Sequence, residues 1–251
     1  MKSRTMVVVV AALALAAGWT ARAAEPPRWT FEITPGLWMA GLEGDMTLAG
    51  QEIDFDRSAG DVLDHMEAGG SVSAKIQCQR LVLGGQVDFF NQSTDDLAVD
   101  GRPPAGRLDA DLLFAEAAAG YMWNGWKEGQ SFTVGVGVRR AQVEAVLDAD
   151  GAGSIRRDRD LTDPMLVLWP VLPLFPSKIK GLTLAPSFSI GGGGDSKLAY
   201  ELFPQLRYQV AKHVVARFGY RTVGYQVDKD RNGNELDFNL AGFLIGLGAT
   251  F

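Results

Sequence analysis

The sequence is poor in two features that stabilise exported proteins or carry them across membranes. It holds one cysteine, Cys78, which excludes an internal disulfide and does not follow the N-terminal segment as a lipid-anchored cysteine would. Beyond that segment no charge-free run reaches the roughly 18 apolar residues that a transmembrane helix needs. The nearest candidate, LVLWPVLPLFP at 166–176, contains three prolines, which would break a helix. Stability must therefore come from a packed core or from strands buried in a membrane.

The N-terminus has the pattern of a secretory signal peptide. Basic Lys2 and Arg4 precede an apolar run, and a small-residue A-x-A site follows at 21–23. We expect residues 1–24 to be removed and residues 25–251 to form one domain. Removal takes away three basic residues, which leaves 21 basic against 30 acidic residues and a net charge of −9. This balance argues against nucleic acid as a partner.

The dominant pattern in the mature chain is alternation of apolar and polar residues, which is typical of half-buried strands. The segments that show it are 29–42, 68–80, 81–92, 108–123, 131–147, 162–175, 181–192, 196–210, 213–227 and 235–251. The connections between them are alternately long or polar and tight, which is the rhythm of an up-and-down barrel. We therefore predict an all-β fold, an antiparallel transmembrane β-barrel of about ten strands with its tight turns and both termini at the periplasmic end.

One face of each predicted strand is almost wholly apolar, and the other carries small residues, amides and charges. A soluble barrel of the lipocalin kind would turn the apolar face inward, and alternation alone does not exclude it. Three features favour a membrane barrel with a polar lumen. The polar face is rich in Gly and Ala, aromatic residues gather near the tight turns, and the last residue, Phe251, belongs to an apolar row.

The lumen of such a barrel is predicted to hold four acids and five bases. They are Glu32, Lys75, Asp88, Glu116, Arg139, Glu201, Arg207, Arg217 and Arg221. Two arrangements are open, because a narrow barrel has limited room and unpaired buried charges are costly. The charges form a structural network that fills the lumen, or the arginines at 207, 217 and 221 face the glutamates at 32, 116 and 201 across a narrow polar pore.

The last segment, FNLAGFLIGLGATF at 238–251, resembles the C-terminal assembly signal of bacterial outer-membrane proteins. That signal is an aromatic last residue with apolar residues at alternate positions before it. The matching row is Phe251, Ala249, Leu247, Ile245, Phe243 and Ala241. The resemblance implies the outer-membrane assembly machinery as a partner.

The start of the mature chain resembles a broad group of uncharacterised proteobacterial outer-membrane β-barrel proteins. Their first strand reads T-P-Y-L-W-x-A-G-L-x-G, and an acidic, helical insert follows it; here the insert corresponds to IDFDRSAGDVLDHME at 53–67. The matching residues are Thr34, Pro35, Leu37, Trp38, Ala40, Gly41, Leu42 and Gly44. Gly36 departs from the usual Tyr, and a GYR segment at 219–221 precedes an acidic loop and the closing strand, as in that group.

This resemblance implies an outer-membrane location and a fold, and it brings no established activity. We expect outer-membrane lipid as the main partner, possible passage of a small solute, no bound organic cofactor and no enzymatic activity. The leading hypothesis is a structural barrel or a narrow small-solute channel. The alternative is a surface interaction or adhesion barrel that acts through acidic extracellular loops.

The loop DKDRNGNELDFN at 228–239 matches the first half of an EF-hand calcium loop. Asp228, Asp230 and Asn232 have the required alternate spacing, but Asn239 stands where a bidentate Glu belongs. Asn232 followed by Gly is also a common hairpin-turn pair. An acidic hairpin tip is the favoured interpretation, and a weak divalent-ion site is the alternative.

The first long loop carries Asp61, Asp64 and His65, which suggests an outer-membrane hydrolase as a third hypothesis. Asp64 and His65 are adjacent, however, and neighbours on a helix do not share a face. The other histidine, His213, belongs to a predicted periplasmic turn, far from this loop. We therefore favour this hypothesis least.

The sixth predicted strand is anomalous. DPMLVLWPVLPLF is apolar on both faces and contains Pro170 and Pro173, each of which removes a ladder donor. The favoured interpretation is a local distortion without function. The alternatives are a loosened wall through which an apolar molecule passes sideways into lipid, and a surface that packs against a partner barrel.

Overall fold

The computed structural model describes residues 29–48, 51–56, 69–94, 98–99, 106–149, 153–227 and 236–251, and the regular structure within them is entirely β. Among these residues no helix is long and apolar enough to cross a membrane. The strands are β1 (Trp29–Leu48), β2 (Gln51–Asp56), β3 (Gly69–Cys78), β4 (Leu81–Thr94), β5 (Ala98–Val99), β6 (Gly106–Asn124), β7 (Ser131–Ala149), β8 (Gly153–Pro173), β9 (Leu182–Leu184), β10 (Ser187–Gly191), β11 (Leu198–Phe203), β12 (Gln205–Ala211), β13 (Val214–Val227) and β14 (Leu236–Thr250).

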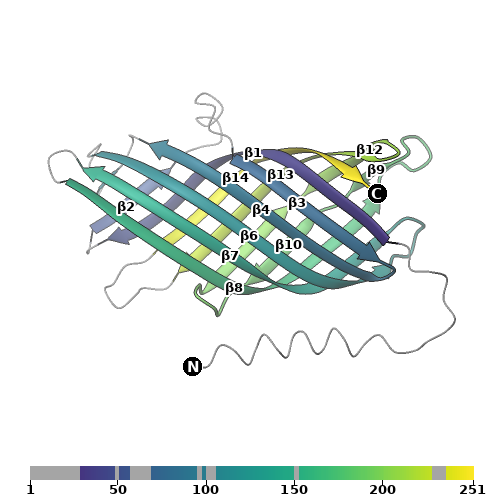
Figure 1. Ribbon diagram of the computed structural model, residues 1–251, viewed down its shortest axis with the longest axis horizontal. Coiled ribbons are helices and arrows are strands. Elements are labelled where there is room, and N and C mark those ends of the chain that lie inside the picture. The colour runs from purple at the N-terminus through teal and green to yellow at the C-terminus, as the bar shows by residue number, and fades with distance from the viewer. Residues whose placement is uncertain are drawn as a thin grey trace.

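The strands close into an antiparallel barrel, which confirms the predicted fold class (Figure 1). Around the wall the order is β1, β3, β4, β6, β7, β8, then β9 with β10, β11 with β12, β13 and β14, and β14 returns to β1. The wall of the described residues thus has ten strand positions, while β2 and β5 extend the sheet beyond β1. A closed wall has no free edge, so its backbone groups are paired within the sheet.

The two ends of the barrel differ. At one end the strands are joined by the turns 79–80, 125–130, 174–181 and 212–213, and the C-terminus lies at this end (Figure 1). We call it the short-turn end and the opposite one the long-loop end.

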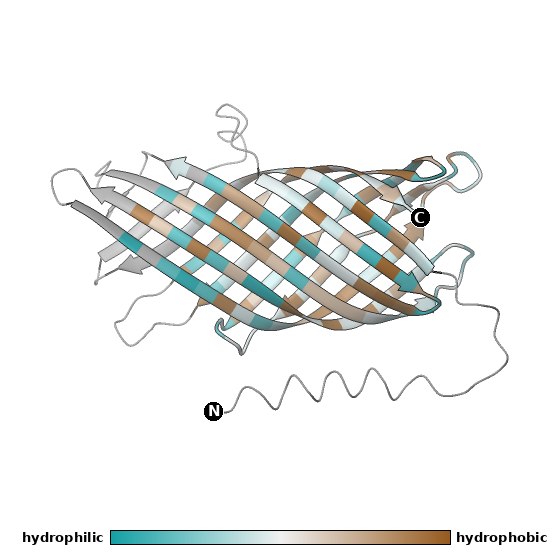
Figure 2. Cartoon of the chain, in the orientation of Figure 1, coloured by the Kyte–Doolittle hydropathy of each residue, from teal (hydrophilic) through white to brown (hydrophobic). Residues whose placement is uncertain are grey.

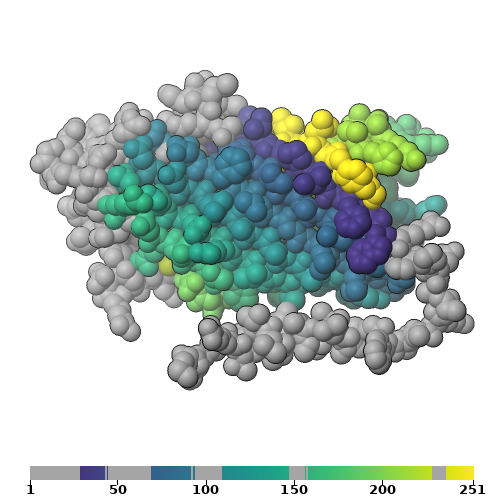
Figure 3. Space-filling model, viewed as in Figure 1, coloured from purple at the N-terminus to yellow at the C-terminus, as the bar shows by residue number. Residues whose placement is uncertain are grey.

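The first and last strands hold each other in the wall. β1 and β14 pair along most of their length. Past the end of β14, the Phe251 amide donates to the Phe31 carbonyl at 2.8 Å, and the Phe31 amide donates back to the Phe251 carbonyl at 3.0 Å. Figure 3 shows the N-terminal strand (purple) lying against the C-terminal one (yellow). The last residue, which would fray as a free chain end, is therefore part of the sheet.

Exposed apolar side chains lie on the outer face of the short-turn half, as lipid-facing side chains do in membrane barrels. Figure 2 shows hydrophobic residues recurring along the strands of this half. We call this surface the apolar belt. It includes Ile33, Leu37, Val72, Leu83, Val87, Phe89, Val134, Val136, Val138, Leu166, Leu168, Leu172, Ile190, Leu202, Leu206, Phe218, Tyr220, Phe243, Ile245 and Leu247. Exposed aromatic side chains gather at its short-turn margin, where an interfacial girdle is expected. They are Trp29, Phe31, Trp123, Trp126, Phe132, Phe175, Tyr208 and Phe251.

β7 and β8 continue past the belt toward the long-loop end, where their outer face becomes charged. Arg140 pairs with Asp160 at 3.1 Å and Arg156 with Glu144 at 2.6 Å, and all four side chains are exposed to solvent. The prediction of a loop over 148–161 was wrong, because β7 reaches 149 and β8 begins at 153. The alternation that reveals a strand fades here because water, not lipid, faces the outer side.

Part of the first long connection is also strand. β1 runs on to residue 48, and β2 occupies 51–56. Residues 53–56 were expected to begin a helical insert, and they pair with β1 and β5 instead. Cross-strand pairing, which a local pattern does not reveal, decides the structure of this segment.

The hairpin between β10 and β11 is fastened to β8 by one buried side chain. The Asp163 carboxylate accepts hydrogen bonds from the Gly194 amide at 3.2 Å and the Ser196 amide at 3.0 Å. It also accepts one from the Ser196 hydroxyl at 2.5 Å. Asp163 is fully buried, so these donors replace its lost hydration.

Candidate functional site

The long-loop half of the lumen is filled with apolar side chains. Phe114 of β6 stacks on Tyr225 of β13 with ring centroids 6.0 Å apart, and Tyr225 stacks on Phe238 of β14 at 5.2 Å. β6 and β13 lie on opposite sides of the wall, so these rings meet across the lumen. Trp38 and Phe90 add an edge-to-face contact at 4.7 Å. The polar lumen predicted from the alternation is therefore confined to the short-turn half.

We call this buried apolar cluster the lumen plug. Its members are Trp38, Ala40, Phe90, Leu112, Phe114, Ala118, Ala141, Leu161, Met165, Val167, Ala199, Phe203, Val223, Tyr225, Val227, Leu236, Phe238, Leu240 and Leu244. Sequence reasoning missed it, because these rows are apolar on the inner face while the outer face is turning polar. The switch of outer residues on β7 and β8 from valine and leucine to arginine and aspartate was the available signal.

A continuous chain of buried charges crosses the lumen on the short-turn side of the plug. Asp88 of β4 pairs with Arg221 of β13, and Arg221 pairs with Glu201 of β11, each at 2.8 Å. Glu201 also pairs with Arg139 of β7 at 2.8 Å, and Arg139 Nε donates to Glu116 of β6 at 2.7 Å. We call these five residues the charge chain. It joins the neighbouring strands β4, β6 and β7 on one side of the wall to β11 and β13 on the other.

Further contacts hold the two arginines of the chain in place. Arg139 donates to the Ser189 hydroxyl at 2.7 Å and to the Tyr200 carbonyl at 3.2 Å. The Arg221 guanidinium lies 4.3 Å from the centre of the Trp38 ring, which joins the charge chain to the plug by a cation–π contact. Both arginines are almost fully buried, so only this dense pairing makes their burial tolerable.

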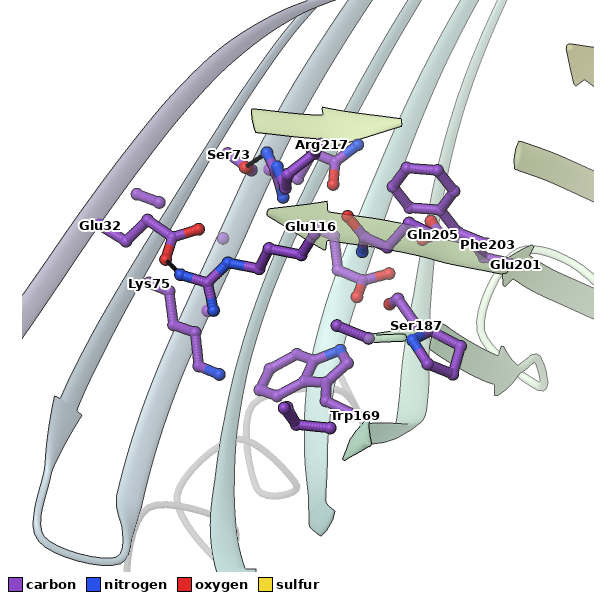
Figure 4. A pocket seen from close by; sticks show the side chains of 18 of the residues that line it. Glu32, Ser73, Lys75, Glu116, Trp169, Ser187, Glu201, Phe203, Gln205 and Arg217 are labelled. Carbon is purple, nitrogen blue, oxygen red and sulfur yellow. Dashed lines mark hydrogen bonds and ion pairs between the residues drawn. The ribbon is translucent and has the colours of Figure 1, made fainter. Parts of the chain in front are cut away.

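Three more bases and one acid lie beside the charge chain, and Figure 4 labels Glu32, Lys75 and Arg217 among them. Glu32 of β1 forms an ion pair with Arg207 of β12, and Arg217 of β13 donates to the Ser73 hydroxyl of β3. Lys75 of β3 stands next to Glu32 in the β1–β3 register. The Nε atoms of Arg207 and Arg217 are buried and have no hydrogen-bond partner in the described part of the chain. We call Lys75, Arg207 and Arg217 the basic group.

A cavity of about 120 Å³ separates the charge chain from the basic group, with room for several waters or a small anion. Figure 4 shows the charged side chains and the Trp169 indole around the same space. The charged side chains in its lining are Glu32, Lys75, Glu116, Glu201, Arg207 and Arg217. On the side of β8 and β10 the lining is Trp169, Pro170, Val171, Ala185, Pro186 and Ser187. The cavity thus reaches from the basic group to the wall.

The wall at that point has a break in its pairing. β8 pairs with β10 as far as Leu168 and pairs again, with β9, from Leu172. This register sets Pro170 of β8 opposite Pro186, which lies between β9 and β10. Neither proline has an N–H to donate, which explains the interruption. We call the facing segments 169–171 and 185–187 the proline seam.

A third proline stands beside Pro186 on the neighbouring strand, but there a backbone hydrogen bond joins the two sides of the wall. Pro204, between β11 and β12, falls opposite Pro186 in the register of these strands. The Ala185 amide donates to the Gln205 carbonyl at 2.9 Å and closes that side. These prolines divide the two strands predicted over 181–192 and 196–210. Of the two prolines noted in the sixth predicted strand, Pro173 still pairs with β9.

Of the ion-binding and hydrolase candidates, only His213 falls within the part of the chain that the structure describes. Asp228, Asp230 and Asn232, as well as Asp61, Asp64 and His65, fall outside the described residues. Within the described ranges, no group of three or more His, Cys, Asp or Glu side chains is placed to hold a metal ion. His213 lies at the short-turn end, where its Nδ1 is 2.9 Å from the Thr250 carbonyl oxygen.

The fold is similar to that of the outer membrane protease OmpT from Escherichia coli. That comparison has a TM-score of 0.63 at 9% sequence identity and covers 91% of this chain and 99% of the protease. The attachment invasion locus protein Ail of Yersinia pestis follows at 12% identity and a TM-score of 0.40, covering 88% of this chain and 98% of Ail. The transport unit of the Escherichia coli autotransporter AIDA-I gives 8% identity and a TM-score of 0.40, covering 95% and 94%. At such identities the likeness concerns the fold alone.

No protein-family model matches the chain, and no curated protein matches it.

Proposed function

We propose that the protein is an integral outer-membrane β-barrel of a Gram-negative bacterium that does not conduct ions through its lumen and acts at its long-loop end, outside the cell. The apolar belt and the aromatic girdle support the membrane location, since such a surface is stable in lipid and not in water. The similarity to the barrel of an outer-membrane protease agrees with it.

The proposal that the lumen is closed to ions depends on the packing of the lumen plug against the charge chain. Rings meet across the lumen at Phe114 and Tyr225, and Arg221, which pairs with Glu201, lies 4.3 Å from the centre of the Trp38 ring of the plug. An ion on this route would have to displace packed aromatic rings and break buried ion pairs, both of which are costly. This geometry argues against the narrow small-solute channel and favours the surface-interaction hypothesis.

The part of the barrel beyond the apolar belt supports a binding function at the cell surface. β7 and β8 carry exposed ion pairs outside and plug residues inside, so the barrel continues as a packed rim in water. The packed rim fixes the strand ends from which the long connections start, and binding residues are often carried by loops on such a scaffold.

Two measurements test this function. Folded protein in planar bilayers should show no discrete conductance steps, and steps from the wild-type chain would refute the sealed lumen. An epitope inserted at 150–152 should be reached by antibody on intact cells, whereas one inserted at 125–130 should be reached only after lysis. The opposite labelling, or recovery of the protein in the soluble periplasmic fraction, would overturn the proposed location and orientation.

A further inference from the structure

We propose that the cavity binds a single-chain amphipathic anion of the long-chain carboxylate class, with its head at the basic group and its apolar chain leaving through the proline seam into lipid. This binding site does not depend on the surface role proposed above. The plug and the charge chain close the route toward the long-loop end and leave the side route open.

The charge around the cavity calls for an anion. Glu116 and Glu201 are engaged by the arginines of the charge chain, which holds three carboxylates against two arginines. The basic group and Glu32 add three positive charges and one negative charge, so the surroundings of the cavity keep a net charge of +1. Of the basic group, Arg207 pairs with Glu32, so Lys75 and Arg217 share the field of that one carboxylate and form no ion pair of their own within the described chain. Within the described chain, Arg217 has the Ser73 hydroxyl and Lys75 has no hydrogen bond or ion pair. A bound carboxylate would accept charge-assisted hydrogen bonds from both and relieve two poorly compensated charges.

The head of the ligand must be small. The cavity measures about 120 Å³, well below the roughly 300–1,000 Å³ of sites that enclose a whole drug-sized ligand. A carboxylate head fits this space, but the rest of a long chain does not. The remainder therefore needs a way out of the lumen.

The seam supplies that exit at the correct height. Leu168 and Leu172, which flank it on the outer face, are 39% and 37% exposed and belong to the apolar belt. A chain that leaves here meets hydrocarbon and not water. Trp169, Pro170 and Pro186 line the passage with apolar surface. Because no register pairs join the two sides over these positions, a chain can part them without breaking ladder hydrogen bonds.

The head site is tested with the refolded full chain in detergent micelles and 11-(dansylamino)undecanoic acid as the probe. Wild-type protein should bind the probe saturably, and Lys75→Gln should weaken the affinity about tenfold, as expected for a lost charge-assisted hydrogen bond. Arg140→Gln, which removes a cation from the outer face, should bind as the wild type does. The neutral probe 11-(dansylamino)undecanol should bind at least tenfold more weakly, and sodium acetate should not compete at equal concentration.

Equal affinity of wild type and Lys75→Gln would overturn the head site. Equal affinity for the neutral probe would overturn the anion, and competition by acetate would show that the apolar chain contributes nothing. Lys75 has no partner to lose, so this variant is expected to fold, and heat-modifiable gel mobility checks that it does. A dodecyl phosphate competitor stronger than dodecanoate would replace the carboxylate with a phosphate as the ligand class.

The seam is tested by the rate at which the probe arrives from lipid vesicles. The double variant Pro170→Val and Pro186→Val restores two N–H donors, so it should pair the seam and slow association at least tenfold. Pro204→Val is the matched control, because its side of the wall is already bridged by a hydrogen bond. If the double variant associates as fast as the wild type and as Pro204→Val, the chain does not pass through the seam and the exit is refuted.

Discussion

Replacing Arg139 should destabilise the barrel far more than replacing its neighbour Arg140. Arg139 is 2% exposed and pairs with two carboxylates inside the lumen, those of Glu116 and Glu201. Arg140 points outward and pairs with Asp160, and both of these side chains are more than half exposed. Removing one partner of a buried ion pair costs about 3–5 kcal/mol, because the other charge stays buried without compensation. An exposed pair contributes little, so Arg140→Met should leave the free energy of unfolding nearly unchanged.

The comparison is made by urea unfolding of both variants in the same lipid vesicles, followed by tryptophan fluorescence and by heat-modifiable gel mobility. Both substitutions replace an arginine with methionine at adjacent positions of β7, so the change in intrinsic strand propensity is the same in the two variants. Arg139→Met should lower the free energy of unfolding by about 3 kcal/mol or more relative to Arg140→Met. If the two variants unfold at the same urea concentration, the charge chain is not paired as described.

A double variant distinguishes the loss of the Arg139 ion pairs from the cost of leaving the largely buried Glu116 charge without a partner. Glu201 keeps Arg221 when Arg139 is removed, whereas Glu116 loses its ion-pair partner. Adding Glu116→Gln to Arg139→Met removes that stranded charge and should recover part of the lost stability. If Glu116→Gln destabilises the single variant further instead, stranding of Glu116 does not explain the loss.

Three further predictions follow from the wall and its turns. Deleting Phe251 removes two backbone hydrogen bonds at the closure, so the heat-modifiable folded fraction should fall in cells, and unchanged assembly would show that the closure does not need it. Leu166→Arg, in the apolar belt, should lower the free energy of unfolding in lipid vesicles by about 2–4 kcal/mol, and Thr162→Arg, beyond the belt, should lower it far less. Equal losses of free energy for the two variants would show that the belt lies elsewhere. Asp163→Ala leaves the Ser196 donors and a neighbouring amide unsatisfied and should cost about 3 kcal/mol, while Ser196→Ala, which keeps the amide bonds, should cost less.

Much of the barrel was predictable because every second side chain of a membrane-spanning strand faces lipid and is therefore apolar. Ile245 and Leu247 alternate with Leu244, Gly246 and Gly248, and the structure exposes the former and buries the latter. The pattern failed where that contrast disappears. Beyond the belt the outer face is charged and the inner face is apolar, so the charged end of β8 resembled a loop and the inward row that includes Phe114 was not recognised as a plug.

The site was predictable only as a set of inward charges. That Arg139 and Arg217 belong to the polar rows follows from alternation, but their partners do not. Arg139 contacts glutamates 23 and 62 residues away, and Arg217 contacts a serine 144 residues away. Such distances are bridged by the closure of the barrel, which no local pattern encodes.

The sequence by itself determined that this chain forms alternating strands with one apolar face, because side chains of a strand point to opposite sides at each step. Only the tertiary structure decided that the lumen is plugged and that Pro170 meets Pro186. Both depend on the register between strands, which sets the residues that stand opposite one another across a ladder or across the lumen. A shift of one residue would turn the charges outward and part the prolines, and the energy of the whole closed wall prevents that shift.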